Sequence, residues 1–266
     1  MLSLLALIDG DIIKYEIGFA AEAYWRHIFE EKGEDGDPET VPWDVVEDMI
    51  YNRIGNIMAM AEADDCILYF TGSRNFRFDE AKLFKYKQRS GRKPFHFNNI
   101  EAYLKSEYKW QQEDGYEADD LMAIALSEDP DNRIICSRDK DLYQVSGWHY
   151  SWAMGYQPER PKEFVTQLGY LELSKNKIRG GGFLFFCAQL LMGDPTDTIP
   201  GVKGYGPVKV FNTLKNCASK EEAFMKVMEI YEKNYGDSWR EWMLEVGRCL
   251  WLCRKEGQKW EFNIYG

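Results

Sequence analysis

The stretch LLALIDGD, residues 4–11, decides the fold, because an unbroken apolar run ends abruptly at Asp9 and Asp11. A short run of this kind is typical of a strand that is buried on both faces of a parallel sheet. No positively charged segment precedes the run, and it is too short to span a membrane, so we expect neither a signal peptide nor an anchor. The stretch predicts a buried strand over residues 4–8 with carboxylates at its carboxyl end.

Acidic side chains also mark the ends of three other apolar segments. They lie in GYEADDLMAIA (115–125), in RIICSRDKD (133–141) and in FLFFCAQLLMGDPTD (183–197). Because the carboxyl ends of parallel strands meet at one edge of a sheet, we expect these acids to converge. Close carboxylates repel strongly at low dielectric, and hard divalent cations prefer oxygen ligands. The sequence therefore predicts a carboxylate-lined pocket for Mg²⁺-like ions.

Apolar runs alternate with helical periodicity through the first half of the chain. We expect strands at 4–8, 64–72, 133–137 and 147–152, and helices at 12–31 and 43–63. This alternation predicts an α/β fold with a parallel sheet. From residue 176 onward the chain is expected to be all-helical, with helices at 207–217, 219–233 and 237–254 and a flexible glycine turn at 180–182. We expect a core over 1–175 and a helical region over 176–266.

Composition places the chain among soluble globular proteins, with 266 residues, 45% apolar and 29% charged. The net charge of −11 disfavours nucleic acid at first sight, but binding depends on local patches rather than on the total. The six cysteines lack zinc-site spacing, so we expect reduced core thiols in an intracellular protein. No membrane partner is expected.

The segment KLFKYKQRSGRK, residues 82–93, concentrates six basic residues around an aromatic ring in this acidic chain. Such a patch suits a surface that follows a nucleic-acid backbone and stacks on bases. A solvated loop or helix face is the alternative, since most charge runs are of that kind.

The segment IPGVKGYGPVKVF, residues 199–211, places three glycines just before an expected helix that begins with proline. Glycine allows close approach of the backbone, and free N–H groups at a helix start bind phosphate. Lysines add positive charge. The pattern resembles the hairpin of helix-hairpin-helix modules, which hold the duplex backbone; the alternative is an ordinary tight turn between helices.

Together, IDGD, YKQRSGR, YEADD, SRDKD and QLLMGDPTDTIPGVKGYG resemble the 5′ nuclease superfamily: flap endonucleases, the 5′ nuclease domains of bacterial polymerases and, most similar, the 5′→3′ exonucleases of tailed bacteriophages. The resemblance implies a PIN-like α/β core, a helical arch, a helix–three-turn–helix motif and two Mg²⁺ or Mn²⁺ ions. The implied ligands, some acting through water, are Asp9, Glu117, Asp119, Asp120, Asp139, Asp141, Asp194 and Asp197.

The resemblance also implies roles for basic and turn residues. Lys87 and Arg92 match residues that grip the scissile phosphate, and Tyr86 matches a position that can stack on a base. The duplex-holding turn often also binds K⁺ in this family. The expected nucleic-acid-binding residues are Tyr86, Arg89, Gly201, Lys203, Gly204, Gly206 and Lys209.

The chain departs from the family at the end of the second strand, where an acid is usual and Thr71-Gly72-Ser73 stands. Asp11 is not included among the expected ligands, because family members often have a neutral residue there. One metal site would thus have one carboxylate fewer.

The first hypothesis is a metal-dependent 5′→3′ exonuclease that hydrolyses double-stranded DNA at 5′ ends, nicks or flaps, with RNA–DNA hybrid left open as a further substrate. The resemblance places it in the cytoplasm of a phage-infected bacterium, in phage replication. The second hypothesis, motivated by the missing acid, is a protein that binds DNA ends or junctions with weak or lost catalysis. The third, a PIN-type ribonuclease, fits less well because such domains usually lack the glycine–lysine turn.

Overall fold

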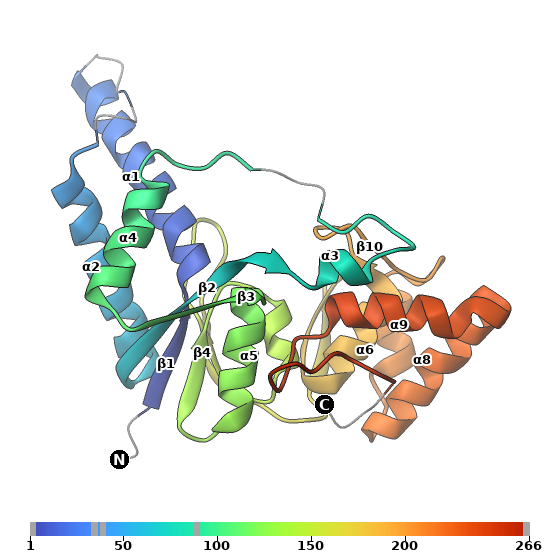
Figure 1. Ribbon diagram of the computed structural model, residues 1–266. Helices are drawn as coiled ribbons and strands as arrows, with labels where there is room; N and C mark the ends of the chain where they lie inside the picture. Colours follow the sequence, from blue (N-terminus) through green and yellow to red (C-terminus); the bar gives the residue numbers. More distant parts are fainter. Residues whose placement is uncertain (1–3, 33–36, 38–40, 88–90, 263–266) are drawn as a thin grey trace.

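The computed structural model describes residues 4–32, 37, 41–87 and 91–262. A six-stranded sheet forms its centre, with the strand order β3-β2-β1-β4-β5-β6 (Figure 1). The neighbouring strands from β3 to β5 pair in parallel, and β6 pairs antiparallel with β5. The strands are β1 (Leu4–Asp9), β2 (Ala63–Asn75), β3 (Trp110–Gly115), β4 (Arg133–Cys136), β5 (Gly147–Ser151) and β6 (Arg160–Val165).

Helices cover both faces of this sheet. Side chains alternate along β1, so that Ala6 and Ile8 pack on one face and Leu7 packs on the other. The first face is covered by α1 (Gly10–Lys32), α2 (Trp43–Ala61) and α4 (Phe97–Glu107). The second is covered by α5 (Ala118–Glu128), as Figure 1 shows. The predicted α/β fold with a buried, mostly parallel sheet is confirmed.

The C-terminal half packs around α6 (Gly182–Met192), which is buried along almost its whole length. Around it lie α7 (Pro207–Leu214), α8 (Lys220–Tyr235) and α9 (Trp239–Leu250), whose side chains form the largest apolar cluster. The short elements are α3 (Arg77–Glu80), η2 (Asp141–Gln144), η3 (Gly236–Ser238), β9 (Gly193–Asp194) and β10 (Ile199–Pro200).

The prediction that everything after residue 176 is helical is wrong. Strands β7 (Tyr170–Ser174) and β8 (Lys177–Gly181) form an antiparallel hairpin across this position. Gly180 and Gly181 belong to β8, where a Cβ atom on either would meet neighbouring atoms at 2.7–2.8 Å. These glycines therefore allow close packing and are not a flexible turn.

The expected arch segment, between Lys93 and Gly115, contains the helix α4, whereas the basic stretch that leads to it is not helical where it is described. Residues 81–87 and 91–94, between α3 and α4, lie in no helix or strand. The described parts of this stretch therefore lie outside regular secondary structure, and the first helix after it is α4.

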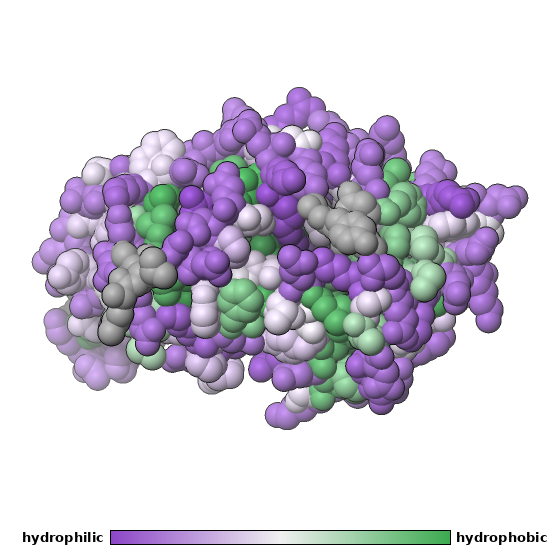
Figure 2. Space-filling model, turned by 90° about the horizontal axis from the view of Figure 1, so that it is seen from below, coloured by the Kyte–Doolittle hydropathy of each residue, from purple (hydrophilic) through white to green (hydrophobic). Residues whose placement is uncertain are grey.

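The apolar side chains lie mainly inside these layers. In the view of Figure 2, hydrophilic side chains cover most of the surface and apolar ones form small separate groups. All six cysteines are free and buried, as expected for core thiols. Among the described residues, no helix has both the length and the apolar character needed to cross a membrane.

Candidate metal centre at the carboxyl edge of the sheet

Four separate segments bring acidic side chains to one edge of the sheet. Asp9 is the last residue of β1, and Asp139 follows β4 by three residues. The α5 segment begins at Glu117, which caps the helix, and Asp194 follows the end of α6 by two residues. The topology thus brings together residues that are far apart in the sequence, as the acidic motifs predicted.

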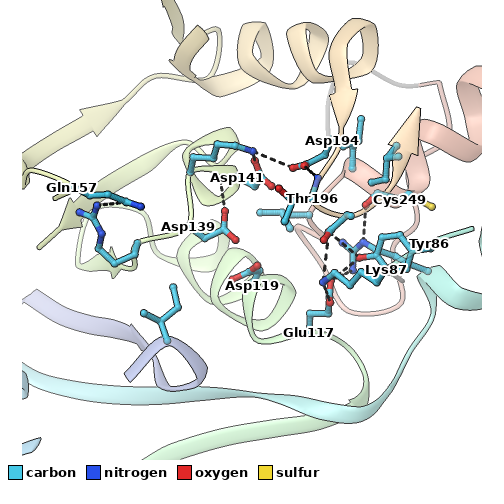
Figure 3. Close-up of a pocket in the computed structure, with 18 of the residues that line it drawn as sticks. Tyr86, Lys87, Glu117, Asp119, Asp139, Asp141, Gln157, Asp194, Thr196 and Cys249 are labelled. Atoms are coloured by element: carbon cyan, nitrogen blue, oxygen red, sulfur yellow. Dashed lines mark hydrogen bonds and ion pairs between the residues drawn. The ribbon is translucent and has the colours of Figure 1, made fainter. Parts of the chain in front are cut away.

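Two adjoining cavities collect these side chains. One, of about 480 Å³, is lined by Glu117, Asp119, Asp139, Asp141, Asp194 and Asp197. The other, of about 810 Å³, is lined by Asp9 and Asp11 and shares Glu117, Asp119 and Asp139 with the first. Figure 3 shows Asp119, Asp139 and Asp141 turned into the same space. Seven of the eight acids predicted as ligands therefore line a continuous site.

Asp120 is the exception, because the structure places it outside both cavities. Its side chain is fully buried and takes two hydrogen bonds from the guanidinium of Arg77, at 2.6 and 2.8 Å. The same guanidinium donates to the backbone carbonyls of Cys249 and Trp251. Asp120 thus holds the end of α9 against α5, away from the cavities. Sequence analysis missed Arg77, because nothing in the sequence links it to either partner.

Two lysines lie among the acids and pair with them. Lys87 pairs with Glu117 and lies 3.6 Å from Asp197, and its backbone N–H donates to the carbonyl of Asp197. Lys140 contacts both Asp141 and Asp194 at 3.0 Å. Lys140 was not among the predicted site residues, although its place between two acids in RDKD is a usable signal. These contacts connect the sheet to the helical half.

Burial and mutual repulsion make several of these carboxylates resist ionisation. Burial, and next the negative charge of Asp11, raises the pKa of Asp9 to about 7. Burial, and next Asp139, raises the pKa of Asp141 to about 7 despite its contact with Lys140. Burial and repulsion from Asp139 and Asp9 raise the pKa of Asp119 well above its ordinary value. For Asp194, by contrast, burial is opposed by Lys140 and by hydrogen bonds from Thr196, which together lower the pKa.

The residues present suit a hard divalent cation. All the candidate ligands are carboxylate oxygens, which Mg²⁺ and Mn²⁺ prefer. The raised pKa values of Asp9, Asp119 and Asp141 show carboxylates that a bound cation would stabilise in their charged form. Across the described ranges, no three His, Cys, Asp or Glu side chains already stand close enough together to hold a metal ion. Instead, four of the acids form ion pairs with lysines: Glu117 and Asp197 with Lys87, and Asp141 and Asp194 with Lys140.

The basic segment only partly reaches the site. Lys87 lines both cavities, whereas Arg92 binds Glu22 on α1 and lines neither. Tyr86 is 6% exposed, with its hydroxyl 3.2 Å from Glu117, so in this conformation it cannot stack on a base. Arg89 lies outside the described residues. Of the predicted phosphate-gripping pair, the structure brings only Lys87 to the cavities.

The glycine–lysine turn joins α6 to α7 as expected. Lys203, Gly204, Gly206 and Lys209 are exposed, and Gly204 has a φ of +80° that favours glycine. Gly201 differs, because a Cβ atom there would lie 2.2 Å from the carbonyl oxygen of Met192. Gly201 therefore serves packing against α6, and the other four residues form an accessible positive turn.

The site thus combines a mostly parallel sheet that is covered on both faces, carboxylates at its carboxyl edge and a basic turn between two helices. No protein-family model matches the chain. DNA polymerase I of Bacillus subtilis (strain 168) is 26% identical over 242 residues, which cover 86% of this chain and 25% of the polymerase. The chain thus spans about a quarter of the length of that curated relative.

Solved structures of bacteriophage T5 proteins share this fold. The D15 protein crystallised with metal ions has a TM-score of 0.57 at 15% identity, over 92% of this chain and 89% of that chain. The T5 5′-exonuclease with bound zinc has a TM-score of 0.54 at 15% identity, over 93% and 99% of the two chains. The D15 flap endonuclease in complex with DNA and metal ions has a TM-score of 0.50 at 14% identity, over 92% and 98%. The chain has the fold of these T5 nucleases, which fits the resemblance to the 5′ nuclease superfamily drawn from its motifs.

Proposed function

We propose that this chain is a metal-dependent 5′ nuclease that hydrolyses phosphodiester bonds of duplex DNA from 5′ ends, nicks or flaps. The observation that supports it most is the collection of seven acids from four distant segments around two adjoining cavities. Few other chemistries require so many like charges in one place. The DNA-bound T5 relative supports the choice of substrate.

The ligands of two Mg²⁺ or Mn²⁺ ions would be Asp9, Glu117, Asp119, Asp139, Asp141, Asp194 and Asp197, all on the cavity walls. Bound ions of this kind supply a water of lowered pKa and stabilise charge on the leaving oxygen. Lys87 lies beside Glu117 and Asp197, where its ammonium group can turn toward a phosphate when the acids are otherwise neutralised.

The turn between α6 and α7 and the two regions of the chain have further roles in this proposal. Lys203, Gly204, Gly206 and Lys209 hold the duplex backbone, and the same turn is a proposed K⁺ site. Residues 1–175 would carry the chemistry, while 176–266 would bind DNA and complete the metal site. RNA–DNA hybrid is a further proposed substrate, and phage replication inside a bacterial host is the proposed setting.

A second candidate is a DNA-end or junction-binding protein with weak catalysis. Two observations favour it: Thr71 stands where β2 reaches the larger cavity, and Lys87 and Lys140 already neutralise part of the acidic wall. Incubating the protein with 5′-labelled and 3′-labelled duplex, nicked and flap DNA, with Mg²⁺ or with EDTA, separates the two functions. Absence of metal-dependent cleavage on every substrate would favour binding alone.

The variant Asp139→Asn sharpens this test. Its amide oxygen can still accept the backbone hydrogen bond that Asp139 takes from Asp141, so the fold should persist. We expect duplex affinity to stay within about threefold and turnover to fall at least about 100-fold. Asp237→Asn, an exposed acid in the helical half, is the control and should cleave normally. A cooperative unfolding transition lost in Asp139→Asn would show a structural role instead.

A further inference from the structure

Three neighbouring strands end at the acidic edge, but only two of them bring an acid there. The order β2-β1-β4 places their carboxyl ends side by side. Asp9 ends β1 and Asp139 follows β4, and both line the larger cavity. Where β2 reaches that cavity, its lining residue is Thr71. The β2 side of the site therefore has no carboxylate of its own.

The carboxylate of Asp11 lies at this place. Asp11 stands in the first turn of α1, and its Oδ2 accepts a hydrogen bond of 2.9 Å from the backbone N–H of Thr71. Both residues line the larger cavity with Asp9, Asp119 and Asp139. A helix from one strand thus delivers a carboxylate to the end of the next strand.

Thr71 itself is engaged in positioning α5. Its Oγ1 accepts a hydrogen bond of 3.1 Å from the backbone N–H of Ala118, at the start of that helix. The adjoining Gly72 N–H donates to the carbonyl of Tyr116 at 3.1 Å. The end of β2 therefore fixes the helix that presents Asp119, and the charge beside it comes from Asp11.

A simpler role for Asp11 would be to neutralise Lys14, whose Nζ lies 2.8 Å from Oδ1. Lys14 is nearly buried, but it also pairs with Glu101 on α4 and lies over the rings of Phe70 and Phe97. Glu101 also pairs with Lys105 at 2.7 Å, so Asp11 and Glu101 share the neutralisation of Lys14. Only Oδ1 of Asp11 is engaged by Lys14, whereas Oδ2 is the oxygen that lies at Thr71. The side chain of Asp11 is 27% exposed, in keeping with a group that faces the cavity.

We propose that Asp11 is a ligand of a divalent cation in the larger cavity, directly or through a bound water, and supplies the carboxylate that β2 lacks. This inference rests on the proposed metal-dependent function. It adds a residue of α1 to the site and explains how an edge with Thr71 on β2 can still bind two ions.

Titration of the full-length protein with Mn²⁺, with free Mn²⁺ measured by electron paramagnetic resonance, tests the proposal without DNA. Asp11→Asn keeps an oxygen for the Thr71 N–H but loses the charge. We expect its Mn²⁺ affinity to fall at least about tenfold. Thr71→Asp in that background should restore most of the affinity, because it returns a carboxylate to the same place. Glu101→Gln, which removes the other partner of Lys14, should bind Mn²⁺ like the unmodified protein.

The outcomes separate this inference from the function beneath it. If the unmodified protein binds no Mn²⁺, both the metal-dependent function and the role of Asp11 as a ligand are overturned. If it binds and Asp11→Asn binds equally well, or Glu101→Gln is impaired to the same extent as Asp11→Asn, only the role of Asp11 is overturned. If Asp11→Asn no longer unfolds cooperatively in EDTA, the single variant Thr71→Asp in the otherwise unmodified protein tests the proposal instead. A gain in its Mn²⁺ affinity supports the position assigned to Asp11, and no gain overturns it.

Discussion

At the scale of a single residue, Asp9 combines burial with repulsion from a neighbouring acid. It is 3% exposed, and its two oxygens accept hydrogen bonds from the Ile12 N–H and the Ser137 hydroxyl. Even so, burial and the charge of Asp11 raise its pKa to about 7. Without a cation, ionising Asp9 therefore destabilises the folded state relative to the unfolded chain.

This conflict predicts that Asp9→Asn is more stable than the unmodified protein in EDTA at pH 8. The pKa of Asp9 is about 7 when folded and near 3.8 when unfolded, so the folded state binds the proton more tightly. Its contribution to stability is complete below pH 4 and is lost as the pH rises through 7. The advantage of Asn should therefore grow between pH 4 and pH 7, by at most roughly 1.4 kcal/mol for each step of one in pH.

Urea unfolding of the two proteins at pH 4, 5.5, 7 and 8 measures this difference. Excess Mn²⁺ should reverse the order at pH 8, because a bound cation stabilises the charged carboxylate. Equal stability of the two proteins in EDTA at every pH would show that Asp9 ionises without conflict.

Residue identity alone could not separate the two neighbouring acids of YEADD. Asp119 and Asp120 follow one another on α5, so their side chains point about 100° apart around the helix. Asp119 faces the cavities and Asp120 faces Arg77. That partner lies 43 positions away in sequence, on a four-residue helix. Spacing predicted which segments converge, and tertiary pairing decided which oxygen atoms are free.

At the scale of elements, apolar runs in the sequence predicted the buried strands correctly, but they gave no signal for the exposed strands. Strands β1, β2 and β4 are apolar and were expected within a few residues of their bounds. Strand β3, WQQEDG, is an edge strand exposed along most of its length, so it carries no apolar alternation. The hairpin β7–β8 was missed for a similar reason, since few of its residues are buried.

The turn between α6 and α7 supports a prediction about DNA binding. Lys203 is exposed beside Gly204, just before the N-terminus of α7, where phosphate binding is favourable. Lys203→Glu should weaken duplex affinity about tenfold and reduce the slope of log K against log salt by about one. Fluorescence anisotropy from 50 to 300 mM KCl measures both.

Lys233→Glu is the matched control, because it makes the same change of charge on the exposed surface of α8. It should leave both the affinity and the slope nearly unchanged. An unaltered salt slope for Lys203→Glu would remove this turn from the DNA-binding surface, and an equal effect of both substitutions would indicate only a response to net charge.

At the scale of the whole molecule, the acidic site is the place where the two halves meet. The sheet half provides Asp9, Glu117, Asp119, Asp139 and Asp141, and the segment after α6 provides Asp194 and Asp197. Lys140 pairs with Asp194, and the Lys87 N–H donates to the Asp197 carbonyl, so each half already reaches into the other. A cation held by carboxylates from both halves would strengthen this junction.

This arrangement predicts that Mn²⁺ stabilises the molecule as one cooperative unit. At a free concentration one hundred times the dissociation constant, binding to the folded state alone adds about 2.7 kcal/mol to the free energy of unfolding. Asp197→Asn removes a partly exposed carboxylate of the helical half. Its ion pair with Lys87, at 3.6 Å, is opposed by the burial that raises the pKa of Asp197, so the carboxylate should add little to stability in EDTA. The stability of the variant should match the unmodified protein in EDTA but rise less with Mn²⁺. Urea unfolding followed by both far-UV circular dichroism and tryptophan fluorescence measures this difference. Equal Mn²⁺ stabilisation of the two proteins would mean that the sheet half holds the ions alone, and so would a separate unfolding transition that does not respond to Mn²⁺.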